Sequence, residues 1–186
     1  MHSLQPRKLS CFARLFSWLY VNISSNMIIQ ASELAEFRKK HANEKIVYCG
    51  GVFDLLHLGH LDVLKELRAE AGDKGLVVVG VTPDSRVKHR KGETRPAHDQ
   101  ETRIAVIDAL RYVDCSFISP ERSKYEFIGY GVLKDLKPNV FITADDVWEQ
   151  ERAWLQEQGT QLKIIPRFSE EISTTITIRN IVKKHS

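Results

Sequence analysis

Residues 45–60 constrain the fold of this 186-residue chain more than any other stretch. Residues 45–49 form an apolar run rich in β-branched side chains, which is typical of a buried strand, and the run ends at two glycines. From Leu58 onward, leucines recur at helical spacing. The segment therefore predicts a strand that turns directly into a helix, which is the building unit of a parallel α/β sheet.

The turn between this strand and helix is suited to bind an anion. The start of a helix presents free N–H groups and the positive end of the helix dipole. Gly50 and Gly51 let the backbone come close to a ligand. His57 and His60 are three residues apart, so they lie on one face of the first helical turn. These features predict a phosphate site with two histidines.

Residues 51–60 read GVFDLLHLGH, and this H-x-G-H pattern resembles the signature of the cytidylyltransferase-like nucleotidyltransferases. Two histidines at a helix start are often only caps or surface residues, but here the flanking sequence matches as well, from about Ile29 to the C-terminus. The resemblance implies that His57 and His60 hold nucleotide phosphates and stabilise charge at the α-phosphate. It also implies nucleotide contacts by the turn residues Gly51, Val52, Phe53 and Asp54.

A second stretch of the same resemblance precedes the last expected helix. Residues 172–175 read ISTT, which resembles the family's second signature. A Ser/Thr cluster before a helix is usually its cap, and its hydroxyls and amides also suit a phosphate. The resemblance implies that Ser173, Thr174 and Thr175 contact the triphosphate. Two signatures more than a hundred residues apart, in the right order, are hard to obtain by chance.

Residues 86–96 read RVKHRKGETRP and are strongly basic. We expect a loop here, because glycine and proline punctuate the stretch. A charged run of this kind is most often solvated surface, yet it follows a strand end, where open α/β sheets bind ligands. The family carries K-G and then R-P at this place. The match favours Lys91 first, as a catalytic residue, and Lys88 second, as a phosphate contact.

Three further residues are nucleotide-binding candidates by resemblance. Arg103 matches an arginine at the start of a family helix, although an exposed helix arginine is nearly as plausible. Asp145 lies in a D-D-x-W-E segment that partly echoes glycerol-3-phosphate cytidylyltransferase, and paired acids are also common helix caps. Arg167 matches an arginine near the nucleotide in the cytidylyltransferases, with one residue inserted.

Strand and helix patterns alternate along the rest of the chain. They predict an α/β fold, a single Rossmann-like domain with a five-stranded parallel sheet flanked by helices. The expected strands are 45–49, 76–81, 113–118, 139–143 and 162–166, and the expected helices are 33–41, 58–68, 100–112, 121–136, 147–158 and 175–184. Residues 1–26 form an N-terminal extension, a non-native start or a leader, and 27–186 the nucleotidyltransferase domain.

Composition narrows the class of protein. The net charge of +3 resides in residues 1–26, so the rest is neutral, which argues against a nucleic-acid partner. The apolar run in that segment is too short to span a bilayer, so no membrane association is expected. Three widely spaced cysteines indicate neither a disulfide framework nor a protein metal site, and fit a cytoplasmic protein.

The resemblance implies an enzyme that transfers a nucleoside monophosphate from ATP or CTP, with Mg²⁺, to a phosphorylated sugar or polyol. Adenylyl transfer to a heptose-type sugar 1-phosphate is favoured by the N-terminal helix and the K-G and R-P matches. Cytidylyl transfer to glycerol 3-phosphate or a related polyol phosphate is the alternative. A non-catalytic nucleotide-binding regulator would keep the fold but release no pyrophosphate. Relatives are commonly dimers, so a homodimer is compatible with the resemblance.

Overall fold

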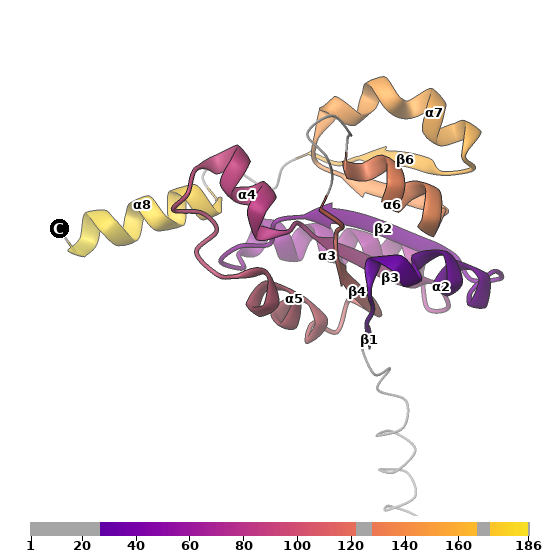
Figure 1. Ribbon diagram of the computed structural model, residues 1–186, viewed down its shortest axis with the longest axis horizontal. Coiled ribbons are helices and arrows are strands. Elements are labelled where there is room, and N and C mark those ends of the chain that lie inside the picture. The colour runs from indigo at the N-terminus through magenta and orange to yellow at the C-terminus, as the bar shows by residue number, and fades with distance from the viewer. Residues whose placement is uncertain (1–26, 122–127, 167–171, 186) are drawn as a thin grey trace, which may run out of the picture.

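The computed structural model describes residues 27–121, 128–166 and 172–185, and its centre is a parallel sheet (Figure 1). Six strands lie in the order β1-β4-β3-β2-β5-β6, and every neighbouring pair is parallel. The strands are β1 (Met27–Ile28), β2 (Ile46–Gly51), β3 (Leu76–Val81), β4 (Cys115–Ile118), β5 (Val140–Thr143) and β6 (Gln161–Ile164). The α/β class and all five expected strands are confirmed.

The expected number of strands was wrong by one. The extra strand, β1, pairs Met27 with Cys115 and Ile28 with Ser116 at the edge of the sheet. Its two residues are too few to show the alternation or apolar run by which a strand is recognised in sequence. Tertiary pairing with β4 creates this strand, so local sequence does not reveal it.

Helices connect the strands and cover both faces of the sheet. They are α2 (Leu34–Lys40), α3 (Leu58–Ala71), α4 (Asp84–Lys91), α5 (Gln100–Asp108), α6 (Ile128–Leu136), α7 (Arg152–Glu157) and α8 (Thr174–His185), with short 3₁₀ turns η1 (Ala31–Glu33) and η2 (Asp146–Glu151). None of the described helices is long and apolar enough to cross a bilayer.

Two expected elements differ from the structure. The basic stretch that begins at Arg86 is not a loop: it is helical as far as Lys91, and Gly92 with a φ of 93° ends the helix. Glycine marks a helix end as readily as a loop, which explains the error. The helix expected over 147–158 is a 3₁₀ turn that becomes α-helical only at Arg152.

Two apolar clusters form the core, one on each face of the sheet. Val47 and Val79 face α3 and α5, where they pack with Leu64 and Ile107. Tyr48, the next residue along β2, points to the opposite face, which α2, α6 and α7 cover. Because side chains alternate along a strand, β2 contributes to both clusters and is buried on both faces.

The carboxyl ends of β2 and β3 are in register, and the connections to α3 and α4 leave from this one edge. Gly50 pairs with Gly80 and Gly51 with Val81, and the Thr82 amide donates to the Gly51 carbonyl at 2.9 Å. Figure 1 shows α8 projecting away from the body beyond this end of the sheet. The fold thus brings segments from both ends of the domain to one edge.

Replacement of a core leucine of α3 tests this packing. Leu64 is fully buried, so Leu64→Ala leaves a cavity and should lower the free energy of unfolding by about 2–5 kcal/mol. Leu58 on the same helix is 56% exposed, and Leu58→Ala should change stability by less than about 0.5 kcal/mol. Urea denaturation monitored by tryptophan fluorescence measures both. Equal losses in the two variants would contradict the packing described.

Candidate active site

The turn after β2 has an unusual backbone. Phe53 and Leu55 have φ values of 52° and 46°, in the left-handed region that side chains other than glycine rarely occupy. A Cβ added to Gly51 would lie 2.9 Å from Cε2 of Phe53, so a side chain there would collide with the phenyl ring. Two left-handed residues on either side of Asp54 turn that residue inward, where it is 1% exposed.

The Asp54 carboxylate holds the loop that follows α4. Its Oδ2 accepts from Nη2 of Arg95 at 3.0 Å and from the Ala97 amide at 2.9 Å, and its Oδ1 accepts from the His98 amide at 3.1 Å. Burial alone would raise the pKa of Asp54, but the two amides and Arg95 together hold it below its usual value. Asp54 is therefore ionised and structurally engaged.

The same residue also holds the start of α8. The hydroxyl of Thr174, itself buried, donates to the Asp54 carbonyl oxygen at 2.6 Å. These two residues are 120 positions apart in the chain. One hydrogen bond therefore joins the H-x-G-H turn to the ISTT segment, and Asp54 connects three stretches of chain at one end of the sheet.

Arg103 is buried under this turn, so the alternative of an exposed helix arginine is wrong. Its side chain is fully buried rather than exposed on a helix surface. It donates to the carbonyls of His98 and Thr82 at 3.0 and 2.8 Å, to the Val52 carbonyl, and to Asp84 at 2.6 Å. A guanidinium bonded in this way positions the turns around the site, and the predicted nucleotide contact of Arg103 stays a prediction.

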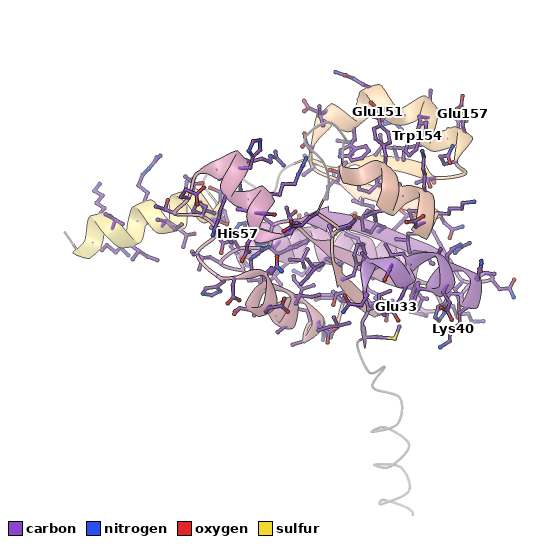
Figure 2. The ribbon with its side chains drawn as sticks, in the orientation of Figure 1. Glu33, Lys40, His57, Glu151, Trp154 and Glu157 are labelled. Atoms are coloured by element: carbon purple, nitrogen blue, oxygen red, sulfur yellow. The ribbon has the colours of Figure 1, made fainter. Side chains whose placement is uncertain are left out.

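The two histidines are stacked at the start of α3. His57 is the N-cap residue, and its ring centroid lies 3.8 Å from that of His60, with 21° between the planes. Nδ1 of His60 accepts from the His57 amide at 3.4 Å, and the ring also contacts Phe53. Figure 2 shows His57 at the end of the sheet that α4 also approaches.

Both histidines are neutral at physiological pH. Burial lowers the pKa of His57, and burial together with the charges of His57 and Lys91 lowers the pKa of His60 to about 4, against the opposing effect of Asp54. Because Nδ1 of His60 accepts a hydrogen bond, the neutral ring carries its proton on Nε2. His60 therefore offers an N–H donor without a charge.

The expected lysines lie on α4. Lys88 and Lys91 are three residues apart on this helix, so they project from one face, and both are exposed. The charge of Lys91 acts on His60, which places the end of α4 beside the histidine pair. The helix thus brings to the site the positive charge that a phosphate would need.

The remaining candidates have mixed outcomes. Ser173 Oγ accepts from the Ile176 amide at 3.3 Å as a cap of α8, and Thr175 is exposed. The Thr174 hydroxyl donates to the Asp54 carbonyl, so part of its hydrogen bonding serves the turn, and its predicted contact with the triphosphate stays a prediction. Asp145 caps η2 by accepting from the Val147 amide at 3.3 Å, the alternative that adjacent acids had left open. Arg167 lies outside the described residues.

A magnesium cage built from protein side chains is not found in the described part of the chain, where no group of three His, Cys, Asp or Glu side chains gathers. The carboxylate of Asp54 already accepts three hydrogen bonds within the protein. Mg²⁺ in nucleotide sites is held largely by phosphate oxygens. The expected Mg²⁺ therefore belongs with the nucleotide substrate.

Comparison with known proteins agrees with this geometry. The sequence model described as "Cytidylyltransferase-like" matches residues 48–180, more than half of the chain. The bifunctional protein HldE of Aliarcobacter butzleri is 35% identical to this chain over 89% of this chain and 33% of its own length. The bifunctional protein HldE of Histophilus somni is 36% identical over 83% of this chain and 30% of its own length. The chain thus spans about a third of these relatives.

Two solved structures resemble the fold. A lipopolysaccharide core biosynthesis protein from Thermoplasma volcanium is 28% identical, with a TM-score of 0.50, over 67% of this chain and 98% of its own. Pantothenate synthetase from Thermus thermophilus is 15% identical, with a TM-score of 0.54, over 87% of this chain and 77% of its own, which supports the fold alone.

The lowered pKa of His60 makes stability depend on pH. An unfolded histidine titrates near 6.5, whereas His60 in the folded chain titrates at about 4, so protons favour unfolding in this window. The contribution of neutral His60 to the free energy of unfolding is complete above pH 6.5 and is lost as the pH falls toward 4. Wild type should therefore lose about 2 kcal/mol more than His60→Gln between pH 7 and pH 5. Urea denaturation at both pH values measures this difference, and parallel pH dependence in the two proteins would contradict it.

Proposed function

Because the chain belongs to the cytidylyltransferase-like family, we propose that it transfers a nucleoside monophosphate from a nucleoside triphosphate to a phosphorylated sugar, with release of pyrophosphate. The observation that carries the proposal is the hydrogen bond of 2.6 Å from Thr174 to the Asp54 carbonyl. It brings the two segments that resemble phosphate-binding signatures to one edge of the sheet. Single signatures are weak evidence, whereas two that meet in space are strong.

The proposed step needs no general base. An oxygen of the acceptor phosphate attacks the α-phosphorus, a new P–O bond forms, and the bond to the β-phosphate breaks, so that pyrophosphate leaves with the electron pair. The attacking oxygen is already anionic, so positioning and charge stabilisation carry the catalysis. The Nε2 donor of His60 suits the α-phosphate, and Lys88 and Lys91 suit the departing phosphates.

Adenylyl transfer is the form of this reaction that we favour. The matched relatives are bifunctional HldE proteins, and the resemblance of this chain to the heptose 1-phosphate adenylyltransferases suggests ATP and a heptose-type sugar 1-phosphate. The echo of glycerol-3-phosphate cytidylyltransferase loses weight, because Asp145 is a helix cap and Trp148 is a core residue packed edge-on against Phe141. Residues that cap a helix or pack in the core are needed for the fold, so this likeness does not show whether the nucleotide carries adenine or cytosine.

Three expectations remain predictions beside this proposal. They are a cytoplasmic location, the absence of nucleic-acid and membrane partners, and a homodimer. A regulator without catalysis also remains the competing class. It would bind nucleotide through the same edge of the sheet but would not release pyrophosphate with any acceptor.

A pyrophosphate-release assay tests the proposal. ATP and CTP are supplied separately with Mg²⁺ and a panel of sugar 1-phosphates, heptose 1-phosphates and glycerol 3-phosphate. We expect release with ATP and a heptose-type 1-phosphate. Loss of the neutral donor in His60→Ala should lower kcat by roughly 10²–10³-fold.

The matched control is His41→Ala. His41 also packs against a phenylalanine ring and is partly buried, but it caps the end of α2, pairs with Glu44 and lies outside the site. This variant should keep wild-type turnover. Release with CTP alone would move the assignment to cytidylyl transfer, and nucleotide binding without any release would favour the regulator.

A further inference from the structure

We infer that Arg95 is a phosphate-binding residue of this site, using donors that the fold leaves without acceptors. The inference rests on the proposed function, because it assigns a contact within the same active site. The sequence pattern had favoured Lys91 and Lys88 on the same stretch. Arg95 follows them in the loop after α4.

Arg95 is held rigidly at the centre of the site. Its side chain is 11% exposed, and its Nη2 donates to Asp54 at 3.0 Å, whose side chain is fully buried. The amides of Ala97 and His98 donate to the same carboxylate, so the loop and the side chain share one anchor. The guanidinium is therefore oriented before any ligand arrives.

Two buried side-chain nitrogens in the described ranges have no hydrogen-bond partner, and both belong to this site. They are Nε of Arg95 and Nδ1 of His57. An arginine Nε carries a hydrogen and can only donate. Buried donors are paired in nearly all native structures, so one that is not paired calls for an explanation. Arg95 is bonded to Asp54 in the strand-to-helix turn, and His57 ends that turn, so both unpartnered nitrogens lie around the same turn.

Arg103 shows what this fold does with a purely structural arginine. It is as close to the turn as Arg95, and all three of its nitrogens donate to acceptors supplied by the protein. Arg95 has a protein acceptor for Nη2 alone among the residues that the structure describes. The contrast indicates that a ligand supplies the acceptor that Nε of Arg95 lacks in the protein.

A phosphate oxygen is the acceptor that fits these surroundings. Asp54 cancels one positive charge, and Lys91 adds another beside His60, so the local balance still favours an anion. Guanidinium groups bind phosphate through several directed donors at once. The nucleotide and the acceptor sugar both carry phosphate, and the shared chemistry does not depend on which one Arg95 meets.

Arg95→Lys separates this role from a structural one. Lysine retains the charge and the pairing with Asp54, but it has no Nε donor and no planar fork. Isothermal titration measures binding of inorganic pyrophosphate and of ATP, each with Mg²⁺, and steady-state kinetics measure KM for the acceptor. Arg95→Gln is the second variant, since it keeps two side-chain donors without charge. Urea denaturation of each variant shows whether it is folded.

Arg68→Lys is the matched control. Arg68 is also partly buried and paired with an aspartate, Asp114, but it lies toward the other end of α3. It should change stability without changing ligand affinity. A comparable loss of stability in the two lysine variants then isolates any loss of binding as specific to Arg95.

We expect folded Arg95→Lys to bind pyrophosphate and ATP about tenfold more weakly or worse. If those affinities hold and the KM of the acceptor rises by that factor instead, the ligand of Arg95 is the acceptor phosphate. Unchanged values for pyrophosphate, ATP and acceptor in both Arg95 variants would overturn the inference. Because pyrophosphate binding needs no turnover, this result is separate from failure of the transfer reaction itself.

Discussion

A single buried carboxylate, that of Asp54, is the constraint on which the rest of the site depends. It is 1% exposed, so its charge must be matched by nearby donors. Arg95 and the amides of Ala97 and His98 supply them, and the left-handed residues on either side of Asp54 aim it at that loop. Removing one partner of such a buried pair costs far more than the pair itself contributes. The loop after α4 is consequently tied to the turn after β2.

This constraint arranges charge where phosphate chemistry needs it. The Thr174 hydroxyl binds the carbonyl of the same aspartate, so α8 begins at the site. Burial keeps His60 neutral, and the neutral ring still offers its Nε2–H to an anionic phosphate oxygen. Lys91 at the end of α4 then supplies positive charge from the exposed side. Donors that are fixed before the reaction stabilise developing charge better than mobile ones.

The parts of this account that could be predicted from sequence depend on local pattern. The strand, glycine pair and two histidines of residues 45–60 are contiguous, and the expected strand-to-helix turn is confirmed. Contacts between distant segments were not predictable. The ISTT stretch predicts that Thr174 binds phosphate. Only the structure shows that its hydroxyl donates to the carbonyl of Asp54, 120 positions away in the chain. Arg103 and Arg95 look alike in sequence, yet one is saturated by carbonyls and the other is not. The strand β1 exists only because β4 lies beside it.

Amide hydrogen exchange of Asp54→Asn, compared with wild type, tests the central role of Asp54 most directly. Asp99→Asn is the control, since Asp99 is exposed, caps α5 by accepting from Thr102, and asparagine caps equally well. The account predicts faster exchange at the amides of Ala97 and His98 and at the start of α8 in Asp54→Asn, with the amides of β3 unchanged and the control like wild type. Unchanged exchange at those two places, or a uniform increase over the whole chain, would contradict it.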